Sequence, residues 1–463
     1  MSFRHHIRTS VLAGLLGSGT AYGGRYLRHR FGRPQPSEAP APRAWWQRPG
    51  IGIQYEIEYR PGMDWHRDFA EFNRSMADES GDLRFNGPLC KVDEWVRLSQ
   101  EVGADYHMME SKWHDGICYF DTALTRWKTP EDYAGRFADL SRKAGIPFMF
   151  YYSSIFDHNP MFDAIQPNRR ATVSFIGALR HPQYEDYLRG QYREIMERYR
   201  PDGMWFDWYW PGEGSTSATI DFFHANHPET VLSFNGSGLF LASQKDLHYT
   251  SSEAHDFDGR YFKLVKAAGA TLPIAQSAWK WANLNRRLFD HPWELITPAG
   301  KWWQDPSLRD DPLDLARMAA VVMACGGRLD VGILSQLDGS LYPEQVGQLR
   351  TLGRWVAPRR HLFASSAALR YRGFLPPGVC ITGRKAKVVA SRLGDDTLLH
   401  LIGSSGDPAA LTVELDRRFL PGAKAVFIEP EHRQLAVERS AAGLSVRVES
   451  QYIDPVDTIL RIQ

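Results

Sequence analysis

The segment GMWFDWYWP at residues 203–211 decides the fold class. Its first five residues are predicted to form a short buried strand that ends in a carboxylate, Asp207, and the amphipathic stretch at residues 184–199 comes directly before it. A helix that leads into a buried strand is typical of a parallel α/β sheet. When such a sheet closes into a barrel, the chemically active residues follow the carboxyl ends of its strands.

The same alternation continues in both directions from this segment. Strands are predicted at residues 51–57, 105–109, 147–152, 203–207, 231–235, 247–250, 272–276 and 329–334. Helices are predicted at residues 91–102, 130–144, 184–199, 218–225, 260–268, 315–325 and 343–355. Proline marks the first turn of two of them, at Pro130 and Pro343. This pattern predicts an α/β fold, a (β/α)8-like barrel over residues 47–362.

The C-terminal part, residues 363–463, has a different texture. Short alternating segments with Gly, Asp and Pro between them lie at residues 379–382, 387–390, 397–402, 411–415, 425–428, 444–448 and 458–462. Alternation over such short segments is typical of antiparallel strands with one buried face. We therefore predict that the barrel is followed by a C-terminal all-β sandwich domain.

Residues 1–46 combine a basic start, a short apolar run at residues 9–16 and a Pro/Ala-rich stretch at residues 34–42. We interpret them as an export signal or anchor followed by a disordered linker, which predicts a periplasmic or extracellular location. The alternative is a disordered tail with an incidental apolar patch on a cytoplasmic protein. The apolar run is far shorter than the roughly 20 residues that cross a bilayer, so no stable membrane span is expected.

The composition excludes several classes of function. The chain has 55 Lys and Arg residues against 54 Asp and Glu, a formal net charge of +1, so no nucleic-acid partner is expected. An apolar fraction of 43% excludes wholesale disorder. The four cysteines form no CxxC pair, and no HExxH, P-loop or convincing GxGxxG motif occurs. We therefore expect neither a metal site nor an organic cofactor.

All 15 tryptophans lie between Trp45 and Trp355. A large core alone does not account for this distribution, because the C-terminal domain would then share them. Trp113, Trp205 and Trp208 lie near predicted strand ends, where an indole ring can stack on a ring-shaped ligand. We predict that these three side chains form an apolar wall of the site.

Two carboxylates at strand ends are the candidates for catalysis. Asp207 ends a buried strand among aromatic residues, where a carboxylate is costly unless it is paired or used. Glu253 follows the predicted strand at residues 247–250, about one strand–helix unit later. Such a pair is what glycoside hydrolysis requires, because one carboxylate attacks the anomeric carbon and the other protonates the leaving oxygen. Alternatively, Asp207 only caps a turn, and His255 or Asp256 acts in place of Glu253.

Three segments carry a resemblance to a known family. KWHDGICYFD (residues 112–121) resembles the Lys-His-His-Asp-Gly-Phe signature of glycoside hydrolase family 29, the α-L-fucosidases. RYRPDGMWFDW (residues 198–208) is similar to the family segment that ends in Trp-Phe-Asp-Gly, and the stretch at residues 324–356 is similar to the family's late Gly-Asn-Leu-Leu-Leu-Asn-Val-Gly-Pro region. The resemblance covers residues 50–362 and implies a barrel followed by a β-sandwich.

The resemblance implies a retaining α-L-fucosidase that acts on a glycan or glycoconjugate, with Asp207 as the nucleophile and Glu253 as the acid/base. It also implies that His114 binds sugar hydroxyls. Trp113 replaces the first histidine of the family pair, Trp208 replaces a glycine, and GIGIQYEIEY (residues 50–59) departs from the family's Phe-Ile-His-Trp-Gly. The remaining predicted substrate-binding residues are Lys112, Trp113, Trp205, Trp208, Tyr55 and Glu56.

Two other functions remain open from the sequence. The missing histidines suggest a carbohydrate-binding relative that has lost turnover, and a separation of more than about 10 Å between Asp207 and Glu253 would favour it, because neither glycosidase geometry extends that far. The other is a glycosidase for a different sugar, with Glu110 or Glu56 as the acid.

Overall fold

The computed structural model describes residues 44–57, 79, 90–166, 175–210, 214–239, 243, 245–253, 291–303, 305–369, 376, 378–383, 386–403, 410–418, 420 and 422–463. The predicted export signal and linker lie outside these residues up to residue 43. The predicted strand at 272–276 and the predicted helix at 260–268 also lie outside them. Among the described helices, each is too short or too polar to span a bilayer.

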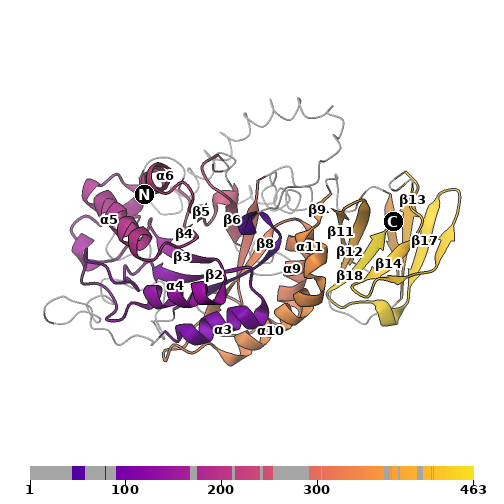
Figure 1. Ribbon diagram of the computed structural model, residues 1–463, viewed down its shortest axis with the longest axis horizontal. Helices are drawn as coiled ribbons and strands as arrows, with labels where there is room; N and C mark the ends of the chain where they lie inside the picture. The colour runs from indigo at the N-terminus through magenta and orange to yellow at the C-terminus, as the bar shows by residue number, and fades with distance from the viewer. Residues whose placement is uncertain are drawn as a thin grey trace, which may run out of the picture.

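Eight parallel strands form a nearly closed barrel (Figure 1). They are β1 (Gly50–Glu56), β2 (Tyr106–Lys112), β3 (Phe148–Ser153), β4 (Gly203–Asp207), β5 (Val231–Phe234), β6 (Thr250–Glu253), β7 (Trp293–Pro298) and β8 (Arg328–Leu334). Their order is β5-β4-β3-β2-β1-β8-β7-β6, so β1 pairs with both β2 and β8. The predicted (β/α)8-like barrel is confirmed.

The barrel contains one strand that the sequence analysis missed. The seventh strand is β7, whereas we predicted a strand at residues 272–276, and β6 begins three residues later than predicted. β7 was overlooked because Glu294 lies within it, and a carboxylate inside a short strand argues against burial. In the structure Glu294 accepts hydrogen bonds from Trp205, Ser251 and Tyr106 inside the barrel. Those partners come from other strands, so the sequence of β7 alone does not reveal them.

Helices pack around the outside of the barrel (Figure 1). They are α3 (Val92–Val102), α4 (Tyr133–Ala144), α5 (Pro182–Arg198), α6 (Ser215–Asn226), α9 (Asp314–Ala324), α10 (Pro343–Val356) and α11 (Arg360–Ala364). Pro343 begins α10 as predicted. Helix α4 begins at Tyr133 and not at Pro130, because the Asp132 side chain caps it by accepting a hydrogen bond from the Gly135 amide.

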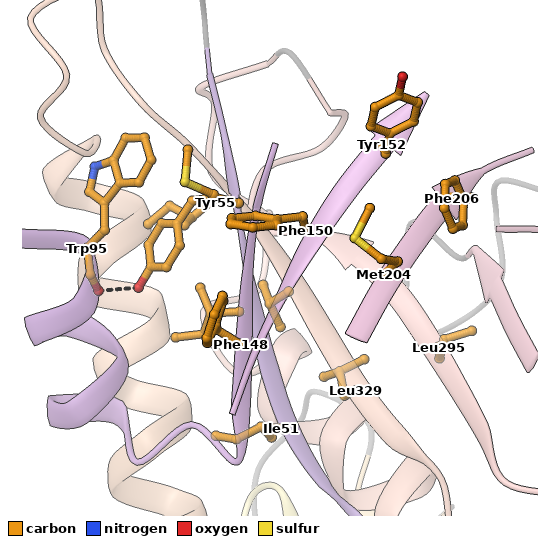
Figure 2. Close-up of a cluster of buried hydrophobic side chains, with 14 of the residues drawn as sticks. Ile51, Tyr55, Trp95, Phe148, Phe150, Tyr152, Met204, Phe206, Leu295 and Leu329 are labelled. Atoms are coloured by element: carbon orange, nitrogen blue, oxygen red, sulfur yellow. Dashed lines mark hydrogen bonds between the residues drawn. The ribbon is translucent and has the colours of Figure 1, made fainter. Parts of the chain in front are cut away.

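Alternate residues of each strand face the helices, and these side chains form the main core. Figure 2 shows Ile51, Tyr55, Phe148, Met204 and other members of this layer. The inward residues form a second, smaller cluster that includes Tyr106, Met108, Tyr151, Trp205 and Tyr249. Because the side-chain period of a strand is two, one residue of register decides whether a side chain reaches the barrel interior or the helix layer.

The C-terminal domain is a β-sandwich, as predicted (Figure 1). One sheet has the order β10-β13-β17-β16 and the other β15-β14-β18-β12-β11-β9. The strands are β9 (Ala367–Ala368), β10 (Val379–Thr382), β11 (Ala386–Leu393), β12 (Asp396–Gly403), β13 (Leu411–Asp416), β14 (Val426–Glu429), β15 (Arg433–Gln434), β16 (Val437–Arg439), β17 (Gly443–Val448) and β18 (Asp457–Ile462). Their neighbours are antiparallel, and the inner faces of the two sheets form a separate core.

Asp454 joins the sandwich to the barrel. Its carboxylate accepts hydrogen bonds from Trp355 Nε1 at 3.2 Å and from the Arg359 guanidinium at 2.7 Å. It also accepts from the backbone amides of Val456 and Asp457, just before and at the start of β18. One side chain thus satisfies groups in both domains, next to an apolar contact in which sandwich residues pack into the barrel's own core.

We expect Asp454→Ala to lower the free energy of unfolding by about 2 to 4 kcal/mol, because it leaves the largely buried Arg359 guanidinium and two backbone amides without their acceptor. Urea unfolding followed by Trp fluorescence measures the change. Glu449→Ala is the control: it removes the partner of the exposed Arg447 and is expected to leave the midpoint unchanged. Equal midpoints for the two variants would contradict the assigned role of Asp454.

Candidate active site

Asp207 lies at the carboxyl end of β4, with its side chain turned into the mouth of the barrel, and is 8% exposed. Its Oδ2 accepts a hydrogen bond from the Tyr151 hydroxyl at 2.7 Å and lies 3.3 Å from His114 Nε2. Its Oδ1 accepts from Asn235 Nδ2 at 2.9 Å and from the Trp208 amide at 3.0 Å. Four donors therefore surround one buried carboxylate.

These donors decide the charge of Asp207. Burial alone would raise its pKa, but the hydrogen bonds and positive charge of His114, together with the bonds from Asn235 and Tyr151, outweigh burial and lower the pKa below its ordinary value. The side chain is therefore a carboxylate at neutral pH. An ionised, oriented carboxylate at a strand end can act as a nucleophile or as a base.

Glu253 ends β6, and its carboxyl group shares a hydrogen-bond donor with that of Asp207. Its Oε2 accepts a hydrogen bond from Asn235 Nδ2 at 3.3 Å, and its Oε1 accepts from Trp303 Nε1. The same Asn235 nitrogen lies 2.9 Å from Asp207 Oδ1, so these two carboxylate oxygens are at most about 6 Å apart. The structure thus brings together the two carboxylates that the sequence analysis paired.

His114 lies against the other side of Asp207. Its Nδ1 is 2.8 Å from Ser153 Oγ, whose proton goes to the Phe156 carbonyl oxygen, so His114 is the donor in this contact. Its Nε2 donates toward Asp207 at the same time, an arrangement that suits a positively charged imidazolium ring. Trp113 stacks on the imidazole with 4.5 Å between ring centroids and fixes its plane.

Trp208 follows Asp207 with a backbone φ of 62°, in the left-handed region that favours glycine. The strain costs about 1 to 2 kcal/mol. It persists because the Trp208 amide donates to Asp207 Oδ1 and the indole packs edge-on against Phe156. The indole is 42% exposed, so solvent reaches it at the mouth of the barrel.

Glu56, the last residue of β1, also faces the mouth. A Cβ atom built on Gly332 of β8 would lie 2.5 Å from Glu56 Oε1 and equally close to the Trp303 ring. Glu56 is therefore next to the indole that holds Glu253. Glu110, one strand away on β2, accepts a hydrogen bond from the Ile57 amide. Among the described residues, no group of three or more His, Cys, Asp or Glu side chains is arranged to hold a metal ion.

A family model described as alpha-L-fucosidase matches residues 56–359. The chain belongs to the α-L-fucosidase family. It is 22% identical to the tissue alpha-L-fucosidase of Macaca fascicularis over 326 residues, or 68% of this chain and 61% of the relative, and 25% identical to the Homo sapiens protein over 330 residues, with the same two shares. The chain thus spans less than two thirds of the length of these curated relatives.

Solved structures of fucosidases share the fold. The Thermotoga maritima alpha-fucosidase in complex with fucose has a TM-score of 0.62 at 17% identity, over 90% of this chain and 96% of that one. A family 29 alpha-L-fucosidase from Bacteroides thetaiotaomicron has a TM-score of 0.62 at 14% identity, over 92% and 96%. The barrel followed by a β-sandwich is therefore the family's architecture.

Lys112 was predicted to bind the substrate, and the structure corrects this. A register shift between Glu110 and Lys112 in the pairing of β2 with β3 places Lys112 opposite Tyr152, which faces the helices. The bulge turns the lysine out of the barrel. There it forms a fully buried ion pair with Asp157 and lies 4.4 Å from the centre of the Tyr152 ring. Lys112 is part of the core behind the site.

Tyr55 and Trp205 also need correction. Tyr55 lies between two inward residues of β1, so its side chain points to the helices, where its hydroxyl donates to the Trp95 carbonyl oxygen (Figure 2). It does not line the mouth. Trp205 does point inward, but it is 1% exposed and donates from Nε1 to Glu294 at 3.0 Å, one inward position below Asp207. It supports the floor of the site and does not form a wall.

Three residues of the site were not predicted from the sequence: Tyr151, Asn235 and Trp303. Tyr151 and Asn235 fall at the ends of predicted strands, so the barrel rule could have selected them. Asn235 is uncharged, so its residue type alone did not indicate a role in the site. Trp303 lies in the loop after β7, the strand that was not predicted. Without that strand, nothing placed Trp303 near the mouth.

We expect Lys112→Met to lower the free energy of unfolding by about 3 to 5 kcal/mol, because it leaves Asp157 charged and buried without its partner. Replacing Asp157 by Leu in the same chain should recover part of the loss, since no unpaired charge then remains. Urea unfolding of both variants measures this. Lys91→Met, which breaks an exposed ion pair with Asp338, is the control and should leave the midpoint unchanged. A Lys112→Met variant of normal stability would contradict the structural role.

Proposed function

We propose that this chain is a retaining glycoside hydrolase of the α-L-fucosidase type, in which Asp207 is the nucleophile and Glu253 the acid/base. The contact of Asn235 with both carboxylates carries the proposal. Retaining enzymes place their two carboxyl groups about 5 to 5.5 Å apart, and inverting enzymes about 6.5 to 9.5 Å apart, to admit a water molecule. An upper limit of about 6 Å between Asp207 Oδ1 and Glu253 Oε2 favours the retaining arrangement.

The reaction takes place in two displacements. An oxygen of Asp207 attacks C1 of the sugar while the bond from C1 to the leaving oxygen breaks, and Glu253 gives that oxygen its proton. The ionised Glu253 then takes a proton from water, whose oxygen attacks C1 and releases Asp207. Tyr151, His114 and Asn235 hold the nucleophile in place before the substrate arrives, which lowers the entropic part of the barrier.

The substrate that we propose is a terminal, α-linked 6-deoxyhexose of the L-fucose type on a glycan or glycoconjugate. The exposed face of Trp208 suits the apolar face and methyl group of such a sugar, which has no polar group at C6. His114 lies beside Asp207, and we propose that a ring hydroxyl of the seated sugar shares its Nε2 donor with that carboxylate. Trp113 stands where the family has a histidine, which favours a glycosidase for a related sugar as the second candidate.

The non-catalytic alternative has less support. A separation of more than about 10 Å between the two carboxylates would favour a binding protein without turnover. The contacts of both carboxylates with Asn235 place them far closer. The hydrogen bonds that keep Asp207 ionised suit turnover better than binding alone, because a neutral sugar needs no ionised carboxylate at C1.

We expect hydrolysis of 4-nitrophenyl α-L-fucoside to fall by at least roughly 1,000-fold in Asp207→Ala and Glu253→Ala. Azide should rescue both variants, and the product should identify each role. The nucleophile variant gives a β-fucosyl azide by direct displacement, whereas the acid/base variant gives an α-fucosyl azide through the glycosyl-enzyme. Proton NMR of the azide product distinguishes the two anomers.

A screen of 4-nitrophenyl glycosides with other sugars identifies the substrate if the fucoside is not cleaved. Turnover of another glycoside with the same azide products would change the sugar and keep the mechanism. Full activity in Asp207→Ala would contradict the proposal. An α-fucosyl azide from Glu56→Ala or Glu110→Ala, with Glu253→Ala fully active, would assign the acid to one of those residues instead.

We expect His114→Gln to shift the acidic limb of the pH profile of kcat/KM to higher pH. His114 contributes to the lowered pKa of Asp207, so its loss raises that pKa, and the nucleophile then becomes protonated at a higher pH as the solution is acidified. Activity near neutral pH should fall less than activity at pH 4 to 5. An unchanged acidic limb would show that His114 does not control the charge of Asp207.

A further inference from the structure

Glu56 is a buried acid for which the proposed reaction has no use. It ends β1, faces the mouth of the barrel, and is 4% exposed. Within the part of the chain that the structure describes, neither of its carboxyl oxygens has a hydrogen-bond partner. A buried polar group without a partner is unfavourable in the free protein and is rare in native structures. A ligand hydroxyl that reached this group and hydrogen-bonded to it would remove the penalty.

The position of Glu56 connects it to the two catalytic carboxylates. Gly332 has no side chain, so Glu56 Oε1 and the Trp303 ring can both lie next to its Cα atom. Any side chain at this position would collide with both. Trp303 in turn donates to Glu253, which shares the Asn235 amide with Asp207. Glu56 therefore lies beside the acid/base, on the wall formed by β1 and β8.

The surroundings of Glu56 favour its neutral form. Burial raises its pKa well above the ordinary value, and the negative charges of Glu110, Glu253, Asp330 and Asp207 raise it further. Lys112, the nearest lysine on β2, is turned out of the barrel and paired with Asp157. A neutral carboxylic acid has one hydroxyl that donates and one carbonyl oxygen that accepts.

We propose that Glu56 is a specificity-determining residue that hydrogen-bonds, as a neutral carboxylic acid, to a ring hydroxyl of the sugar cleaved between Asp207 and Glu253. This inference rests on the proposed glycosidase function. The substrate class is thereby narrowed to sugars with a hydroxyl group on the side of the ring that faces β1 and β8. A sugar that lacks this hydroxyl leaves Glu56 without a partner and is rejected.

Two substitutions separate this role from the others. Glu56→Gln keeps one donor and one acceptor in the same shape, so kcat/KM for 4-nitrophenyl α-L-fucoside should stay within roughly threefold of the wild type. Glu56→Leu removes both, and kcat/KM should fall roughly tenfold or more. If Glu56 instead transferred the proton or paired with a cationic sugar, Glu56→Gln would be as inactive as Glu56→Leu, and the inference would be overturned.

Monodeoxy substrates identify the hydroxyl. The 2-, 3- and 4-deoxy analogues of the aryl fucoside are compared in the wild type and in Glu56→Leu. For one analogue, the loss of kcat/KM seen in the wild type should largely disappear in Glu56→Leu, because its partner is already missing. Equal losses in both proteins for all three analogues would overturn the inference.

Tyr55→Phe is the matched control. It changes the neighbouring residue of the same strand, whose side chain faces the helices, and should lower the unfolding temperature without changing kcat/KM. Binding of the aryl fucoside to Asp207→Asn, measured by calorimetry, separates the two proposals. If the wild type cleaves no aryl glycoside and Asp207→Asn binds none, the proposed function fails. If it cleaves the fucoside and both Glu56 variants match it, only the inference about Glu56 fails.

Discussion

The hydrogen bonds of one neutral side chain organise the site. Asn235 donates from a single nitrogen to Asp207 and to Glu253, so it limits the distance between the two carboxyl groups. Asn235 is held in turn by its own backbone, whose amide donates to the Phe206 carbonyl oxygen at the end of β4. The spacing of the two carboxyl groups thus follows from how β4, β5 and β6 lie side by side.

Three residues at the mouth of the barrel are in states that are unfavourable for folding. Asp207 is buried but accepts four hydrogen bonds, and Trp208 is held in a conformation suited to glycine. Glu56 is buried without a hydrogen-bond partner among the described residues. Each feature is unfavourable for folding. All three lie within one end of the barrel, while the helix-facing layer behind them is packed with apolar and aromatic side chains. The packing of this core offsets the unfavourable states of the three residues at the mouth.

One bulge on β2 separates residues that face the barrel interior from residues that face the helices. Before it, Glu110 follows the inward register of Tyr106 and Met108, and after it, Lys112 faces the helices. The chain then returns to the mouth with His114. A motif of consecutive charged and aromatic residues is thereby divided between two environments, and a lysine that looks like a ligand-binding group becomes the buried partner of Asp157.

The sequence by itself determined the barrel, the sandwich that follows it, and the two carboxylates at strand ends, because these depend on hydrophobic periodicity and on residues adjacent along the chain. Only the tertiary structure decided which other side chains contact these two carboxylates. The side chains of Tyr55 and Lys112 point out of the barrel toward the helices, and the side chain of Trp205 lies beneath the site. Asn235 and Trp303, from β5 and the loop after β7, complete it. Strand register and contacts between distant segments decide these placements, and neither is encoded in the local pattern around a residue.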